Sequence, residues 1–245
     1  TVGVVQGIYD AYENFIDLSM GGETANCYIL NSAGQYKFPI IKGNGQKGVI
    51  IKGDTAELPT AKDAKIVWQD GNIISSVGVN NGYVVFETES RWTKGNAVVA
   101  VTDESGAILW SWHIWSTDYV LGTNDITVYN HSRTKTYKMM NYTLGEVGST
   151  APFYQFGRKD PFPESVTNVS TGGSLEKSIK NPDIYYSSSG YDWCSDSRSD
   201  WWDAGYTSYH SSSSTSSVLK GGKTIYDPCP AGYRVPPDDA FTNFT

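Results

Sequence analysis

The pattern of apolar and polar positions in the first half of the chain is that of short β-strands. Apolar residues alternate with polar ones in short runs, and each run is bounded by Gly, Asn, Asp or Ser. Short strands at regular spacing with turn signals between them are typical of a β-sandwich. We therefore predict a sandwich domain over residues 23–118, after a linker or the tail of a preceding module over residues 1–22. The runs lie at 26–30, 35–41, 48–52, 65–69, 73–79, 83–88, 96–102 and 107–115.

Several of these runs are joined by short sequences that favour tight turns. Gly, Asn and Asp tolerate the backbone conformations that turns between strands require. Around Ser32–Gly34 the spacing predicts that the strands at 26–30 and 35–41 form a hairpin. The other turn sequences are Asp70-Gly71, Asn80-Asn-Gly82 and Asp103-Glu-Ser-Gly106.

The strand at 107–115 is apolar on both of its faces. Side chains alternate between the two faces of a strand. One face carries Trp110, Trp112 and Ile114, and the other carries Leu109, Ser111, His113 and Trp115. We predict a central strand that is covered on one side by the facing sheet and on the other by the next module. Trp112 and Trp115 are then expected at the seam between the two units, and His113 has a packing role.

After Asp118 the sequence becomes polar and irregular. We predict a second, loop-rich α+β module over residues 119–245, which we expect to be incomplete at its C-terminus because the chain stops soon after residue 236. A Ser-rich stretch at 187–217 is too polar to carry a core and is expected to form a long surface loop.

Composition and charge exclude several classes of partner. Gly, Tyr and Trp are abundant and only 18% of residues are charged, which favours turn-rich β structure. The net charge of -7 disfavours a nucleic-acid partner, because phosphate binding needs clustered Lys and Arg. We find neither an apolar run long enough to cross a bilayer nor a basic amphipathic segment, so we expect no membrane contact by this segment.

No motif in the sequence indicates a reaction. His113, His131 and His210 are far apart, and no Gly-x-Ser-x-Gly sequence surrounds any serine. The acidic pair Asp103-Glu104 lies in a predicted turn, where solvated carboxylates are expected. We predict a protein that is not an enzyme and has no cofactor.

The aromatic part of the Ser-rich stretch is the best candidate for a recognition surface. Flat rings offer apolar faces to sugar C–H groups, while Asp and Arg can hydrogen-bond hydroxyl groups. The same carboxylates suit calcium, although nothing else in the sequence supports that ion. In the alternative interpretation, these rings only anchor the loop to the domain beneath it. The candidate ligand-binding residues are Trp193, Asp196, Arg198, Asp200, Trp201, Trp202, Asp203, Tyr206 and Tyr209.

The three cysteines, Cys27, Cys194 and Cys229, do not show the spacing of a metal site. In an exported protein Cys194 and Cys229 are candidates for a disulfide that clamps the loop between them. The alternative for each cysteine is a buried thiol, since an unpaired cysteine behaves as a small hydrophobe.

Four motifs in fixed order carry a resemblance to a known family: Ala25–Pro39, Ile108–Asp118, Gln155–Phe162 and Asp227–Pro236. With them the chain resembles the fimbrillin-like surface proteins of the Bacteroidetes, and its second half resembles the C-terminal major paralogous domain first described from Fibrobacter. The resemblance implies an immunoglobulin-like β-sandwich followed by a C-type-lectin-like module. It also implies a location at the cell surface, in the outer membrane or outside the cell.

One segment departs from that family pattern, since Met139–Gly145 replaces the usual Met-Asp-Arg-Asn-Leu-Gly. From the resemblance we expect a non-catalytic surface protein for adhesion or for assembly of a fimbria-like appendage. The alternative is a glycan-binding module of a surface nutrient-uptake system, and an enzyme ranks third. The expected partners are a glycan or another surface ligand, copies of this chain, or other appendage subunits.

Overall fold

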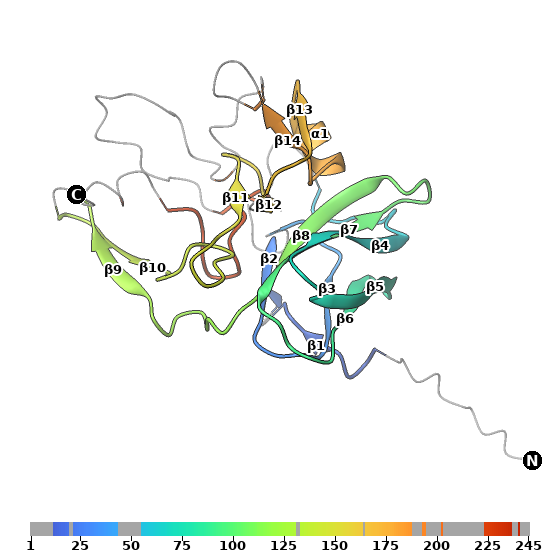
Figure 1. Cartoon of the computed structure of the whole chain (residues 1–245), viewed down its shortest axis with the longest axis horizontal. Helices are drawn as coiled ribbons and strands as arrows, with labels where there is room; N and C mark the ends of the chain where they lie inside the picture. The colour runs from blue at the N-terminus through green and yellow to red at the C-terminus, as the bar shows by residue number, and fades with distance from the viewer. Residues whose placement is uncertain are drawn as a thin grey trace, which may run out of the picture.

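The computed structural model describes residues 12–19, 22–43, 55–130, 133–163, 165–187, 193–194, 202, 223–236 and 240. Within them the secondary structure consists of strands and a single short helix, α1 (Leu175–Lys180) (Figure 1). The β-dominated class predicted from the sequence is therefore confirmed. No helix in this described part has the length and apolar character needed to span a bilayer.

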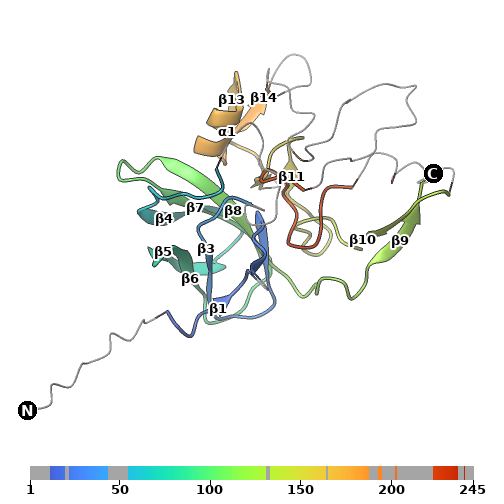
Figure 2. The ribbon, with the colours of Figure 1, turned by 180° about the vertical axis from the view of Figure 1, so that it is seen from behind.

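Two four-stranded sheets form the sandwich, and Figures 1 and 2 show them stacked at one end of the molecule. Every strand run expected from the sequence is present as a strand, except that 48–52 lies outside the described residues. In the first sheet the order is β1 (Ile16–Asp17), β3 (Gln35–Pro39), β6 (Tyr83–Thr88), β5 (Ile74–Asn80). In the second sheet the order is β2 (Cys27–Leu30), β8 (Ile108–Ser116), β7 (Gly95–Thr102), β4 (Asp63–Gln69).

The hairpin predicted around Ser32–Gly34 is wrong. Its two strands lie in different sheets, β2 parallel to β8 and β3 antiparallel to β6. Both strands point aromatic side chains into the space between the sheets, where the rings of Tyr28 and Phe38 stack with centroids 4.4 Å apart. Two strands that face each other across a core cannot also pair edge to edge, so the short turn crosses from one sheet to the other.

The sandwich also begins earlier than the sequence indicates. Residues 1–22 were expected to be a linker or the tail of a preceding module, yet β1 pairs in parallel with Tyr36 and Lys37 of β3. Phe15, just before β1, is buried. Ile16 itself is 54% exposed, which explains why this short strand has no clear apolar pattern.

The hairpin β5–β6 has the turn that its sequence predicts. Asn81 and Gly82 have φ angles of 46° and 80°, the left-handed pair that matches the twist of two antiparallel strands. The Asp103–Gly106 turn likewise joins β7 to β8, and the Asp103 carboxylate accepts hydrogen bonds from the backbone of Ser105 and Ala107. In contrast, Asp70-Gly71 carries the chain from β4 in one sheet to β5 in the other.

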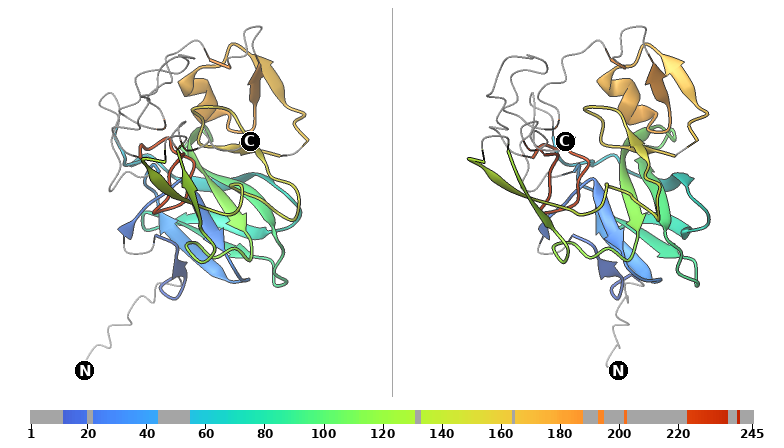
Figure 3. Two further views of the ribbon diagram at one scale, coloured as in Figure 1. Left: turned by 90° about the vertical axis from the view of Figure 1, so that its left-hand side faces the viewer. Right: turned by 60° about the vertical axis from the view of Figure 1, so that its left-hand side comes forward.

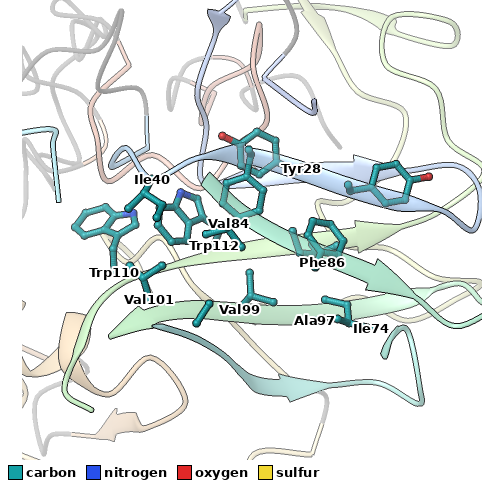
Figure 4. Packing of buried hydrophobic residues seen from close by; sticks show 14 of the residues in the cluster. Tyr28, Ile40, Ile74, Val84, Phe86, Ala97, Val99, Val101, Trp110 and Trp112 are labelled. Atoms are coloured by element: carbon teal, nitrogen blue, oxygen red, sulfur yellow. The ribbon is translucent and has the colours of Figure 1, made fainter. Parts of the chain in front are cut away.

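The space between the sheets is filled by large apolar side chains (Figure 4). Trp112 of β8 is completely buried and meets Phe38 edge to face, with ring centroids 5.1 Å apart. Figure 4 shows Val99 and Val101 of β7 on the same side as the β8 tryptophans, facing Phe86 of β6. Each such side chain stabilises the fold by about 1.5–3 kcal/mol through burial. Trp112 therefore belongs to the sandwich core, and the expectation that it lies at the seam is wrong.

The second half of the chain is built from small, separate elements that lie beside the sandwich and at one end of it (Figure 3). The hairpin β9–β10 extends away from the sandwich, while α1, β13 and β14 gather at one end of it (Figure 1). The pairs are β9 (Ile126–Tyr129) with β10 (Thr136–Met139), β11 (Phe153–Tyr154) with β12 (Pro161–Phe162), and β13 (Val169–Thr171) with β14 (Tyr185–Ser187).

Candidate functional site

The outer face of β8 is covered by the second half of the chain, as the apolar pattern of this strand predicts. Ser111, His113 and Trp115 alternate along this face, and all three are fully or almost fully buried. Each contacts a different part of the 145–160 segment. The seam between the two halves of the molecule therefore runs along β8.

A buried ion pair lies at the first of these contacts. The Lys159 ammonium donates to both carboxylate oxygens of Asp160, at 2.7 and 2.9 Å, and to the hydroxyl and carbonyl oxygens of Ser111, at 2.6 and 2.8 Å. The ammonium also lies 4.5 Å from the ring centroid of Trp110. Burial lowers the pKa of Lys159 to about 8, against the opposing effect of the Asp160 carboxylate.

A serine hydroxyl beside a lysine of lowered pKa resembles an activated nucleophile. Here, however, Ser111 is 0% exposed, and Lys159 and Asp160 are 3% and 2% exposed. No substrate can reach a hydroxyl enclosed in this way. The cluster is therefore a polar joint that fixes the second half of the chain to the sandwich.

Arg158, the residue before Lys159, connects the same segment to a different part of the second half of the chain. Its guanidinium donates five hydrogen bonds, and four of them tie the 155–158 turn to the region around α1 and β14. The acceptors are the side chain of Gln155 and the carbonyl oxygens of Ser178, Asn181, Pro182 and Ile184. The rings of Phe162, Tyr186 and Trp193 surround it at 4.6–5.6 Å. The Gln155–Phe162 motif thus organises the packing of the second half.

His113 occupies the middle of the seam. Its Nδ1 lies 3.0 Å from the hydroxyl of Tyr154, and its Nε2 lies 2.9 Å from Oδ1 of Asn96. The Asn96 amide nitrogen donates to the carbonyl of Gly145, so Oδ1 must be the atom that faces the ring. His113 therefore donates from Nε2 and accepts the tyrosine proton at Nδ1.

Burial lowers the pKa of His113 to about 3. The imidazole is neutral at physiological pH, and both of its nitrogens are engaged. This arrangement ties Tyr154 and Gly145 to the central strand and agrees with the packing role expected of His113.

A partly open pocket of about 940 Å³ lies between the β9–β10 hairpin and the 228–236 segment. Residues 140–146 form the side next to the sandwich, and Tyr154 and Trp202 complete the lining. The lining is more apolar than polar, with five aromatic side chains: Tyr137, Tyr142, Tyr154, Trp202 and Tyr233. A volume in this range is typical of small-molecule sites.

The polar atoms of three of these rings are hydrogen-bonded to other groups of the protein. The Tyr154 hydroxyl is bound to His113, and the Trp202 indole nitrogen donates to the carbonyl of Arg158 at 3.2 Å. The Tyr233 hydroxyl contacts both carboxylate oxygens of Asp125, at 3.0 and 2.8 Å. A ring held at its polar end has one orientation, so these rings form a rigid surface.

Tyr142 is held by stacking. Its ring centroid lies 4.8 Å from that of Tyr119, which in turn lies 5.7 Å from that of Trp115. Tyr119 also donates its hydroxyl proton to Asp125 at 3.1 Å. The outer face of the sandwich is thus connected to the pocket through three successive rings.

The 228–236 segment is held by a buried carboxylate and an ammonium group. Asp227 accepts hydrogen bonds from the backbone nitrogens of Cys229 and Val235. Lys223 donates to the carbonyl oxygens of Cys229, Pro230 and Tyr233 at 2.6–2.7 Å. Burial raises the pKa of Asp227, and the nearby ammonium of Lys223 opposes that shift. The Asp227–Pro236 motif is therefore a turn whose carbonyl oxygens accept hydrogen bonds from the ammonium group of Lys223.

Asn26 attaches this turn to the sandwich. Its amide nitrogen donates to the carbonyls of Ile225 and Asp227, at 2.6 and 2.8 Å, and its oxygen accepts from the Trp110 indole. Ile225 and Asp227 are 199 and 201 positions away from Asn26 along the chain, so this side chain fixes two distant parts of the sequence together.

Of the nine candidate ligand residues expected from the sequence, the structure describes Trp193 and Trp202. Trp193 is 4% exposed and donates to the carbonyl of Phe156, so it anchors its segment. Trp202 lines the pocket and packs edge to face on Phe156 with centroids 4.6 Å apart. The others, Asp196, Arg198, Asp200, Trp201, Asp203, Tyr206 and Tyr209, lie outside the described residues, as do His131 and His210.

The candidate disulfide is not present, since no bond joins Cys194 and Cys229 in the described structure. Cys194 forms a β-bridge with Gly173, next to the Arg158 cluster, whereas Cys229 lies in the Lys223 turn. All three cysteines are buried, and burial raises the pKa of the Cys27 and Cys229 thiols above the ordinary value. The alternative expectation, a buried thiol at each position, agrees with these surroundings.

The residues described here contain no group of three or more His, Cys, Asp or Glu side chains that could hold a metal ion. The carboxylates considered for calcium are among those outside the described residues, so calcium binding is still only a hypothesis from the sequence. No family model, curated protein or solved structure matches this chain.

Sequence reasoning did not find the pocket because its parts are far apart along the chain. Asp125 and Tyr233, which are in direct contact, are 108 positions apart. The Met139–Gly145 and Asp227–Pro236 motifs were both conspicuous in the sequence, but nothing in either one indicates that they face each other.

Proposed function

We propose that this chain is a non-catalytic cell-surface protein that acts in adhesion by holding a ligand in the aromatic pocket. The observation that carries the proposal is the pocket itself, with rigid rings on a concave and partly open surface. A preorganised aromatic surface binds a partner with little loss of side-chain entropy.

The non-catalytic part of the proposal is supported by where the reactive residue types lie. The side chains that most resemble a nucleophile and a general base, Ser111, Lys159 and His113, are enclosed at the seam and hydrogen-bonded to neighbouring groups. The surface location is supported by the resemblance of the four motifs to Bacteroidetes surface proteins.

The test is an adhesion assay with the purified chain. Beads coated with the chain are expected to retain bacterial or epithelial cells, and Tyr142→Ala is expected to reduce the number of retained cells. Phe153→Ala is the matched control, because Phe153 is also aromatic, is 53% exposed and does not line the pocket. Retention no better than on albumin-coated beads would contradict the proposal, and so would turnover in a broad hydrolase screen that persists through purification.

Assembly of a fimbria-like appendage is the second candidate, and one observation favours it. In the described part of the chain, β9 and β10 pair only with each other, and Ile126 and Tyr129 are 38% and 47% exposed. An open strand edge with apolar neighbours can pair with a strand of another chain. Light scattering that gives a monomer at every concentration would count against assembly.

A further inference from the structure

We propose that the pocket between the β9–β10 hairpin and residues 228–236 is a binding site for a neutral oligosaccharide. This inference rests on the proposed adhesion function and names the ligand class for it. The site differs from the surface expected from the sequence. Of the nine residues expected there, the described lining of the pocket contains Trp202 alone.

The first argument is the kind of surface that the rings offer. Because the polar atoms of Tyr154, Trp202 and Tyr233 are bonded to protein groups, these side chains present mainly carbon surface to a ligand. Sugar rings carry patches of C–H groups that pack on aromatic carbon. Rings with fixed orientation suit a rigid pyranose better than a flexible chain.

The second argument is the balance of charge. Among the described lining residues, the carboxylates of Asp125 and Glu146 are matched by the cationic groups of Lys138 and Arg234. The whole chain carries a net charge of -7, which disfavours anionic polymers. A site of balanced charge in an acidic protein favours a neutral ligand.

The third argument separates a saccharide from a lipid or another wholly apolar ligand. The pocket contains the charged groups named above and the exposed amide of Asn141. An apolar ligand would remove water from these groups without replacing its hydrogen bonds, which disfavours its binding. Sugar hydroxyls both donate and accept, so they replace those bonds.

The size and opening of the pocket indicate how much of a glycan it holds. Its volume of about 940 Å³ is at the upper end of the usual range for small ligands, so more than one sugar ring fits. Because the pocket is only partly enclosed, a longer glycan can continue into solvent. A glycan attached to a cell surface could therefore be bound without being cut.

The test is a printed array of neutral, sialylated and sulfated glycans probed with the intact chain, followed by calorimetry on the best neutral binder. At least one neutral oligosaccharide is expected to bind. Tyr142→Ala is expected to weaken its binding by about tenfold or more, whereas Phe153→Ala stays within about twofold. Binding only to charged glycans, uptake of the apolar dye Nile red in place of any glycan, or neutral-glycan binding that survives Tyr142→Ala would each overturn the proposal.

A second variant guards against misfolding, because Tyr142 packs on the cluster of Cys27, Trp115 and Tyr119. Asn141→Trp puts a bulky group on an exposed lining position without deleting a buried contact. It is expected to abolish glycan binding with an unchanged melting temperature. Full glycan binding by this variant would also overturn the proposal.

The bead assay separates this proposal from the adhesion function. If cells are retained in a manner that depends on Tyr142 but no neutral glycan binds, the adhesion function is supported and the proposed ligand class is wrong. If a neutral glycan binds but no cells are retained, the ligand class is supported and the adhesion function is contradicted.

Discussion

The seam along β8 and the pocket use similar residues in opposite ways. At the seam, the polar groups of Ser111, Lys159 and Asp160 point at one another and are sealed from water. At the pocket, the hydroxyls of Tyr154 and Tyr233 are hydrogen-bonded to His113 and Asp125, and their rings line the concave surface. The difference shows that a cluster of reactive side chains indicates catalysis only where a substrate can reach it, whereas the rings of the pocket line an open surface while their polar atoms are hydrogen-bonded.

The two regions are also mechanically linked. Tyr154 belongs to both, since its ring lines the pocket and its hydroxyl is bound to His113 at the seam. A change at the seam should therefore affect both stability and the pocket, while a change at the pocket should affect binding far more than stability.

The largest effect is expected from breaking the buried ion pair. Asp160→Ala leaves the Lys159 ammonium buried without its carboxylate, and loss of one partner of such a pair costs about 3–5 kcal/mol in free energy of unfolding. Urea denaturation followed by tryptophan fluorescence measures it. The double variant Lys159→Met with Asp160→Leu removes both charges and is expected to recover much of that loss. A single variant as stable as the wild type would mean that the cluster does not hold the seam.

The next effect is a pH dependence that His113 imposes on stability. In the unfolded chain this histidine has a pKa near 6.5, whereas in the folded protein burial lowers the pKa to about 3. The unfolded state therefore binds the extra proton between these values. The contribution is constant above pH 6.5, and the free energy of unfolding falls by about 1.4 kcal/mol per pH unit as the pH drops from 6.5 towards 3.

Denaturation curves at several pH values, for the wild type and for His113→Gln, isolate that contribution. Glutamine has no titrating group, so the difference between the two proteins should change with pH in this window and be flat above it. Parallel curves from pH 7 to pH 4 would show that His113 is not the residue responsible, and would contradict the neutral buried imidazole.

Features of the fold that depend on residues close together in the sequence could be predicted, whereas contacts between residues far apart in the sequence could not. The strands within the described residues, the β5–β6 turn and the two covered faces of β8 follow from local alternation and turn chemistry, and they are confirmed. The strand expected at 48–52 lies outside the described residues. The assignment of β2 and β3 to different sheets could not be predicted, because a short turn fits both a hairpin and a crossover, and the stacking of Tyr28 on Phe38 decides between them. The pocket could not be predicted either, since Asp125 meets Tyr233 only after the whole chain has folded.

A smaller effect on stability is expected from a change at Tyr233, which lines the pocket and is hydrogen-bonded to Asp125. Tyr233→Phe keeps the ring and removes its hydrogen bonds to Asp125. Because these groups are only half-buried, the free energy of unfolding should fall by about 1.5 kcal/mol, at the lower end of the range for hydrogen bonds to charged groups. Glycan affinity should fall more than stability does, since the freed ring samples several orientations. Unchanged affinity would show that the hydroxyl does not orient the ring.

The smallest energetic effect, and the simplest measurement, concerns the thiols. Cys27, Cys194 and Cys229 are buried at different places, and burial disfavours the thiolate form of Cys27 and Cys229. A thiol-reactive disulfide reagent should therefore label none of them in the native protein at neutral pH and all three after denaturation without reductant. Alanine in place of Cys229 would make the denatured count two. If one thiol alone were labelled in the denatured wild type, two cysteines would be joined. A bond between Cys194 and Cys229 would require the packing around Gly173 or around Lys223 to differ from the contacts described above.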